Sequence, residues 1–311
     1  MPDDWVGGAV FSPDRTALFV ATNKKSGPTR PTLTCWDVAT WKPRWTSALA
    51  ARATELAITN DGRFVYSIQA DRAPQVIDAT TGARTRELDT RTGWPTVWPV
   101  GQSDLLVIAR TDRSHPELVR WNLATGEATT VLAELPDALD GLAFDTTLGL
   151  AALVTRDPGG GPNVAVIDLG SQRALHVVSN AHSSGRLVFR TAASELVDIA
   201  GWNDLQQPVI YDARGGRKLA VVAAPDVVAP RAFALSGDGR WLAVGYGEQI
   251  DNHGPYEDLC VRIFDLDKRV LHRRVPLDEL GEPHALAFDH ADHLLAFSAG
   301  FEPRLMAIPV A

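Results

Sequence analysis

The chain has 311 residues, which is enough for two average domains or for one large all-β domain. Its composition is ordinary for a globular protein, with 45% hydrophobic and 22% charged residues. Its net charge of -8 argues against broad binding to nucleic acid or acidic membranes, because both need a basic surface.

The first residues, MPDDWVGGAVF, carry acids where a secretory signal needs positive charge, and they lack an apolar stretch. No run of about 18 apolar residues follows elsewhere in the chain, so we expect no membrane-spanning helix and a cytoplasmic protein. Only five of the 30 basic residues are Lys, and this bias towards Arg is typical of a GC-rich bacterial genome. Cys35 and Cys260 lie in different repeats, so we predict buried or reduced thiols and no disulfide.

One short pattern recurs along the chain, in which an aromatic residue or Ile precedes Asp or Asn at the end of an apolar segment. The first copy is Trp36-Asp37, and the spacings from each copy to the next are 41, 44, 46, 44, 53 and 44 residues. An Asp in this place can bind the backbone N–H groups of the turn that follows, so we predict a structural role for it. The acidic or amide positions are Asp37, Asp78, Asn122, Asp168, Asp212 and Asp265, and Pro309 stands at the seventh.

Each copy follows an apolar segment, a polar turn and a second apolar segment, which is the pattern of a β-hairpin. Asn60-Asp61-Gly62 and Gly237-Asp238-Gly239 have the residues that tight turns require. A further predicted strand follows each of the first six copies, so these repeats are predicted to contain four strands. Helical periodicity is nearly absent, and Pro136 interrupts the one stretch considered, Leu132–Leu142.

A four-stranded unit of 40–50 residues is the blade of a β-propeller. We therefore predict an all-β fold, a single seven-bladed β-propeller over residues 1–311 with four-stranded antiparallel blades. The expected blades cover residues 8–50, 53–90, 93–135, 138–181, 183–225, 229–277 and 281–311.

The repeats resemble those of WD40 and YVTN-type propellers, on the strength of Trp36-Asp37, the DATTG at Asp78–Gly82 and the NLATG at Asn122–Gly126. The Gly-His pair that opens many WD40 repeats is missing, so the resemblance is to a divergent member. It implies the propeller fold across essentially the whole chain. It implies no particular activity, because propellers serve as enzymes, receptors and scaffolds.

Closure of the predicted ring has three alternatives, because the last repeat ends with its third strand at Arg304–Ala311. Residues 1–7 could supply the missing strand, over about Asp3–Val6. The last blade could instead have three strands and lack the outer strand that the other blades have. In the third case a partner donates a strand to its edge. Pro309 suits an edge strand, where a missing N–H is tolerated.

The connections between successive repeats and the loops between second and third strands share one end of the blades, which we call the loop face. Aromatic residues and arginines recur there, and both types are enriched in binding hot spots. The alternative is that these residues have a structural role, in which the arginines pair with nearby aspartates and the Trp residues fill gaps between blades. The predicted partner-binding residues are Trp94, Trp202, Tyr256, Phe301, Arg52, Arg91, Arg110 and Arg231.

Catalytic motifs of the common hydrolases, metalloproteases and nucleotide-binding proteins are missing from the sequence. We therefore expect a non-catalytic scaffold, without cofactor or metal, whose loop face binds a protein or peptide as a subunit or sensor of a larger assembly. The alternative is a lactonase-like small-molecule hydrolase with a site at the channel mouth. Its candidate residues form no recognisable constellation in the sequence: Glu55, Asp140, Arg231, Glu282 and His284.

Overall fold

The structure is a computed structural model in which 16 segments of the chain can be described. These are residues 4–24, 30–69, 72–87, 97–100, 102, 104–110, 116–132, 141–156, 162–178, 183–200, 207–223, 230–249, 256–277, 283–288, 293–298 and 305–309. The chain divides into two compact units. Unit 1 comprises residues 1–135, 284–309 and 311, and unit 2 comprises residues 136–283 and 310.

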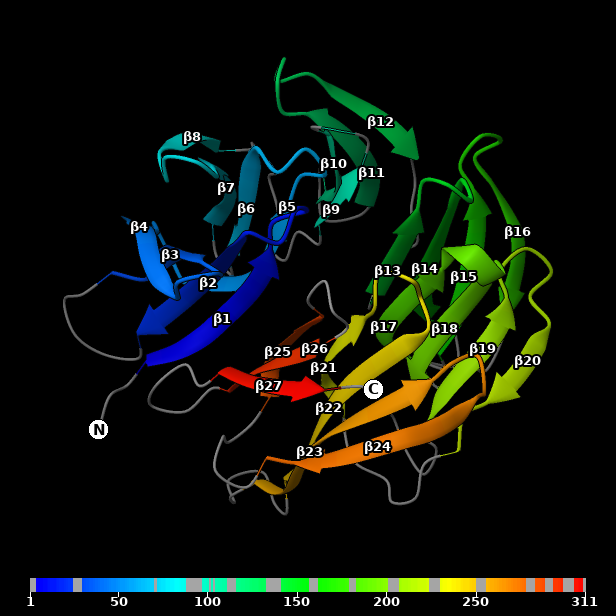
Figure 1. The fold of residues 1–311 in the computed structure, drawn as a ribbon. Coiled ribbons are helices and arrows are strands. Elements are labelled where there is room, and N and C mark those ends of the chain that lie inside the picture. Colours follow the sequence, from blue (N-terminus) through cyan, green and yellow to red (C-terminus); the bar gives the residue numbers. More distant parts are fainter. Residues whose placement is uncertain are drawn as a thin grey trace. The chain divides into compact units, whose positions relative to one another are not determined.

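Unit 1 contains four antiparallel sheets, each formed by strands that follow one another in the chain (Figure 1). The first sheet consists of β1 (Asp4–Phe11), β2 (Ala17–Lys24), β3 (Thr32–Asp37) and β4 (Lys42–Ala48). The second consists of β5 (Ala53–Ile58), β6 (Phe64–Gln69), β7 (Arg72–Asp78) and β8 (Arg84–Glu87). The third consists of β9 (Val97–Val100), β10 (Asp104–Arg110), β11 (Pro116–Asn122) and β12 (Ala128–Leu132). The seventh consists of β25 (Pro283–Phe288), β26 (His293–Ser298) and β27 (Leu305–Pro309).

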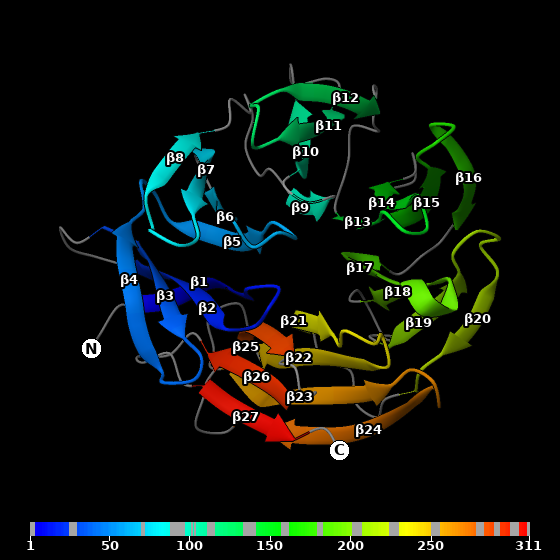
Figure 2. The same cartoon turned by 45° about the horizontal axis from the view of Figure 1, so that its top comes forward.

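Unit 2 contains three sheets with the same strand order (Figure 2). The fourth sheet consists of β13 (Gly141–Asp145), β14 (Leu150–Arg156), β15 (Pro162–Asp168) and β16 (Arg173–Val178). The fifth consists of β17 (Ser183–Arg190), β18 (Glu195–Ala200), β19 (Pro208–Asp212) and β20 (Lys218–Val221), with a 3₁₀ turn at Thr191–Ala193. The sixth consists of β21 (Pro230–Leu235), β22 (Trp241–Gln249), β23 (Tyr256–Asp265) and β24 (Val270–Pro276).

The prediction of four-stranded antiparallel blades is therefore confirmed for six sheets, and the seventh has three strands among the described residues. The arrangement of seven blades in one ring stays a prediction, as does a partner strand at the edge of β27. Within the described segments the one helical element is the short 3₁₀ turn, and none is long and apolar enough to cross a membrane.

One of the three alternatives for ring closure, a strand over about residues 3–6 added to the last sheet, is wrong for residues 4–6, and residue 3 lies outside the described residues. Asp4, Trp5 and Val6 pair with β2 and form the start of β1. The strand continues past Gly7 through a register shift, so the two adjacent glycines do not end it. A Cβ on Gly7 would collide with the carbonyl oxygen of Ala53 in β5, which explains why a glycine stands there.

The repeated Asp or Asn caps the turn between the third and fourth strands, as the sequence predicts. Its side-chain oxygen accepts the backbone N–H two or three residues later, with Asp78 Oδ1 2.8 Å from the Thr81 nitrogen. The residue four positions later has positive φ in all six turns. Glycine accepts this conformation with little strain, yet three copies carry other residues there. These positions are Trp41, Gly82, Gly126, Gln172, Gly216 and Arg269.

The hydrophobic cores lie between neighbouring sheets. Phe19 and Leu33 of the first sheet pack with Ile58 and Val65 of the second. The fourth and fifth sheets share a second core, and the fifth and sixth share a third. Both cysteines are buried, as predicted, and Cys35 belongs to the first of these cores. Alternate residues of each inner strand thus face the next sheet, which is what a blade requires.

Candidate functional site

Half of the predicted loop-face residues lie outside the described part of the structure. Trp94, Trp202, Arg91 and Phe301 are among the residues not described. Three others have a described backbone only: Arg110 at the end of β10, Arg231 in β21 and Tyr256 at the start of β23. Arg52 is exposed just before β5. The loop face therefore stays a prediction.

The residues weighed for a hydrolase are also spread over separate elements. Glu55 lies in β5 and His284 in β25, whereas Asp140 and Glu282 fall outside the described residues. Among the residues that the structure describes, no group of three or more His, Cys, Asp or Glu side chains is placed to hold a metal ion.

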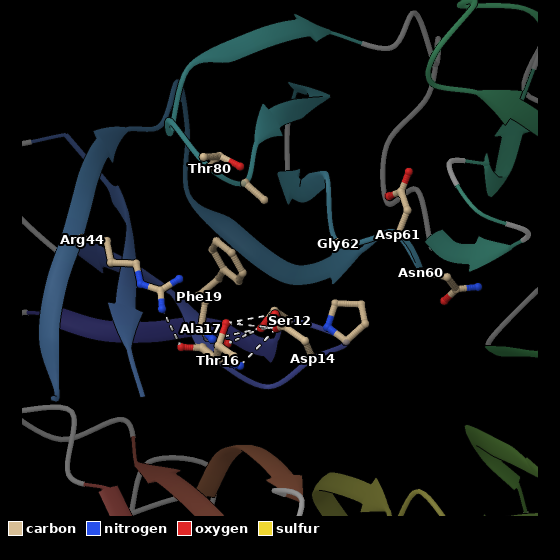
Figure 3. Close-up of a pocket in the computed structure, with 12 residues that line it drawn as sticks. Ser12, Asp14, Thr16, Ala17, Phe19, Arg44, Asn60, Asp61, Gly62 and Thr80 are labelled. Carbon is tan, nitrogen blue, oxygen red and sulfur yellow. Dashed lines mark hydrogen bonds between the residues drawn. The ribbon is translucent and has the colours of Figure 1, made fainter. Parts of the chain in front are cut away.

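A pocket of about 470 Å³ lies between the first and second sheets, at the end of the blades opposite to the loop face. It is bordered by the β1–β2 turn, the β5–β6 turn and the turn after β7 (Figure 3). Sequence reasoning did not identify this pocket. Its lining residues are Ser12, Pro13, Asp14, Thr16, Ala17, Phe19, Arg44, Asn60, Asp61, Gly62, Ala79 and Thr80.

Asp14 is held in the β1–β2 turn by a local network of hydrogen bonds, drawn as dashed lines in Figure 3. Its Oδ1 accepts the Ser12 hydroxyl at 2.6 Å and the Thr16 backbone N–H at 3.1 Å. The hydrogen bond from Ser12, followed by that from Thr16, lowers the pKa of Asp14 below its usual range. Asp14 is exposed and carries a negative charge at neutral pH.

Arg44 of β4 lines another side of the pocket, and its guanidinium forms an ion pair with Asp37. Its guanidinium donates two hydrogen bonds to Asp37 Oδ2, at 3.1 and 2.7 Å, and a third to the Thr16 carbonyl at 3.0 Å. The hydrogen bond from Arg44, with those from Thr40, lowers the pKa of Asp37 to about 2. Arg44 thus ties the outer strand of the first sheet to its first turn.

The β5–β6 turn repeats the chemistry of the β1–β2 turn. Asp61 Oδ1 accepts the Thr59 hydroxyl at 2.6 Å and the Arg63 N–H at 3.0 Å. Asp238 does the same in the β21–β22 turn with Ser236 at 2.5 Å and the Arg240 N–H at 2.9 Å. In the sequence the signal is Ser or Thr, any residue, then Asp between two strands. The sequence indicates that Asp61 and Asp238 are turn residues, but it does not show the hydrogen bonds that the three aspartates have in common.

Hydrogen bonds also link each sheet to the next within each unit. Trp45 of β4 donates its Nε1–H to the Ala79 carbonyl of the second sheet at 3.1 Å. His176 of β16 makes the equivalent bond to the Ala213 carbonyl of the fifth sheet at 3.2 Å. Four more hydrogen bonds join neighbouring sheets in the same way. Their donors and acceptors are Asp61 N–H to Gln102 O, Arg214 to Leu148 O, Arg190 to Gly239 O and Arg15 to Phe288 O.

Arg190 is the most buried of these links and belongs to a small charged network. Its side chain is 11% exposed, and its Nη1 lies 3.0 Å from Glu195 Oε2. A second guanidinium nitrogen contacts Asp267 of the sixth sheet, and Arg269 lies 3.4 Å from the other oxygen of Glu195. Because each buried charge has an opposite partner, the cluster fastens the fifth sheet to the sixth.

Comparison with known proteins supports the fold. No protein-family model matches the chain, and no curated protein matches its sequence. Among solved structures, "Kuenenia stuttgartiensis Hydrazine Synthase" is similar with a TM-score of 0.75 and 16% sequence identity. The match covers 99% of this chain and 96% of that one. At this identity the likeness shows the fold alone, and this chain has a β-propeller fold with four-stranded antiparallel blades.

Proposed function

We propose that this chain is a non-catalytic, WD40-like propeller scaffold that binds a protein or peptide through its loop face, as a subunit or sensor of a larger assembly. The proposal includes seven blades closed into one ring. Its predicted binding residues are Trp94, Trp202, Tyr256, Phe301, Arg52, Arg91, Arg110 and Arg231.

The observation that carries the proposal is the repeated linkage between sheets. Every pair of neighbouring sheets within a unit shares at least one hydrogen bond from a side chain or turn to a backbone carbonyl. Such links fix the blades, and fixed blades hold the ends of their loops at constant separations. A preorganised surface loses little conformational entropy when it binds, which favours recognition of a partner.

The residue types expected on the loop face suit this role. Trp and Tyr supply a large contact area with few rotatable bonds, and Arg adds hydrogen bonds in a planar arrangement. Nothing in the described residues favours the hydrolase alternative over the scaffold.

Co-purification from the native host tests the proposal. A tagged wild-type chain should retain a partner at a stoichiometric ratio, and the double variant Trp94→Ala/Trp202→Ala should lose it. Trp41→Ala is the matched control, because Trp41 is 44% exposed at the β3–β4 turn, at the other end of its sheet. Retention of the partner by the double variant would contradict the proposed surface. A bound metal or a chelator-sensitive hydrolytic activity would favour the alternative function.

The seven-bladed ring has its own test. The proposal rests on the seven repeats of the sequence and on the sheets that they form. Electron-microscopy class averages viewed along the ring axis should show seven blades around one channel. A different number of blades, or two separate bodies, would contradict it.

A further inference from the structure

We propose that the pocket between the first and second sheets binds an arginine or lysine side chain of a peptide partner. This inference rests on the proposed function, because it assumes that the chain binds a protein. It adds a second contact surface, at the opposite end of the blades from the loop face, and it states the chemistry of the occupant.

The volume and the lining of the pocket suit a long side chain. Its volume of about 470 Å³ is at the lower end of typical ligand pockets and suits one side chain with its adjoining backbone. Pro13, Ala17, Phe19 and Ala79 are among its lining residues, and Phe19 is 1% exposed. The methylene groups of Arg or Lys can lie against such a surface while the charged end stays in water.

The charges around the pocket favour a cation. Asp14 and Asp61 stand on the two turns that border it, one from each sheet. The lining includes one cation, Arg44, whose guanidinium is bound to Asp37 at 2.7 Å and whose charge also acts on Asp14. The lowered pKa of Asp14 keeps its carboxylate ionised at neutral pH. A basic partner also matches the net charge of -8 on the whole chain.

A titration with acetyl-Ala-Arg-Ala-amide tests the proposal directly. Binding is followed by amide chemical shifts in NMR spectra of the full chain, with the citrulline peptide as the neutral isostere. Residues 12–17 and 60–62 should shift in a saturable way, with a dissociation constant on the order of a millimolar. The citrulline peptide should bind at least about threefold more weakly, and added salt should weaken the arginine peptide. Equal binding of the two peptides would overturn the proposal.

A matched pair of neutral substitutions separates binding from turn stability. Asp14→Asn should weaken the arginine peptide by about two- to fivefold, which is the range of an exposed ion pair. Asp238→Asn removes the same carboxylate from an equivalent turn that does not border the pocket. It should leave peptide binding unchanged. Equal effects of the two variants would overturn the proposal.

A second pair of variants adds charge at exposed turn positions and leaves every carboxylate in place. Thr80→Lys puts a tethered cation at the edge of the pocket and should abolish binding of the free peptide. Ala124→Lys is the control, because Ala124 is exposed at the equivalent turn position of the third sheet. If Thr80→Lys binds the peptide as the wild type does, the pocket is not the site.

The outcomes also separate this inference from the scaffold proposal. Loss of a native partner from Trp94→Ala/Trp202→Ala together with a failed peptide titration would refute the pocket and leave the scaffold standing. Peptide binding at residues 12–17 with no effect of the two Trp substitutions on a native partner would refute the loop face and leave the pocket.

Discussion

The close contact between Gly82 of the second sheet and Trp45 of the first predicts how much Gly82→Ala lowers the free energy of unfolding. Gly82 has a φ of +71°, and a Cβ there would lie 2.6 Å from Trp45 Cε3 and 2.7 Å from Ser47 Oγ. An alanine in the left-handed conformation costs about 1–2 kcal/mol. Displacing the Trp45 ring adds about 1–3 kcal/mol of strain, with the hydrogen bond to Ala79 also at risk. We expect the free energy of unfolding to fall by about 2–5 kcal/mol.

Gly126→Ala is the matched control within the same unit. Gly126 occupies the same turn position with a φ of +82°, but its neighbour is Nη1 of Arg86 at 2.6 Å. The end of an arginine can rotate away, so only the backbone cost of about 1–2 kcal/mol should remain. Urea denaturation followed by circular dichroism measures both variants, and the m-value should not change. Equal destabilisation by the two substitutions would show that Trp45 does not pack against the turn as described.

Three further predictions follow from the described charges and thiols. The pKa of Asp37 is lowered to about 2 from its ordinary value of 3.8, so its stabilising effect is present above about pH 4 and is lost as pH falls towards 2. The difference in melting temperature between wild type and Asp37→Asn should therefore disappear over that window, and a constant difference down to pH 2 would contradict it. Cys35 and Cys260 are buried, and burial raises the pKa of Cys35 to about 11, so neither should react with Ellman's reagent at pH 8 until the chain unfolds; rapid reaction of the folded protein would disprove this. Arg190→Met leaves Glu195 without its closest charged partner and should cost about 3 kcal/mol in urea denaturation, whereas a loss under about 1 kcal/mol would mean that the cluster contributes little.

The repeat and its capping Asp could be predicted because both are local. The pattern at Asp78–Gly82 gives the strand end, the acceptor and the glycine that takes positive φ. The same turn at Trp41, Gln172 and Arg269 could not be recognised by its glycine, because other residues take that conformation there. In those copies the hydrogen bonds of the turn outweigh the cost of a left-handed residue.

The start of β1 and the pocket could not be predicted, because both depend on contacts between sheets. The repeat pattern predicts a first blade that begins at residue 8, but β1 begins at Asp4 and includes Gly7, where Ala53 of the next sheet approaches closely. The pocket joins turns that are about one repeat apart, and Asp14 and Asp61 each have a sufficient local reason to be there. Their common role at one site is visible only when the two sheets are placed side by side.

The central claim is that the loop face binds a protein, and the affinity of a purified partner tests it most directly. Calorimetric titration should give a dissociation constant at least about tenfold weaker for Trp94→Ala/Trp202→Ala than for the wild type, as expected for hot-spot residues. Trp41→Ala should stay within about twofold of the wild type. The same affinity for all three proteins would contradict the claim.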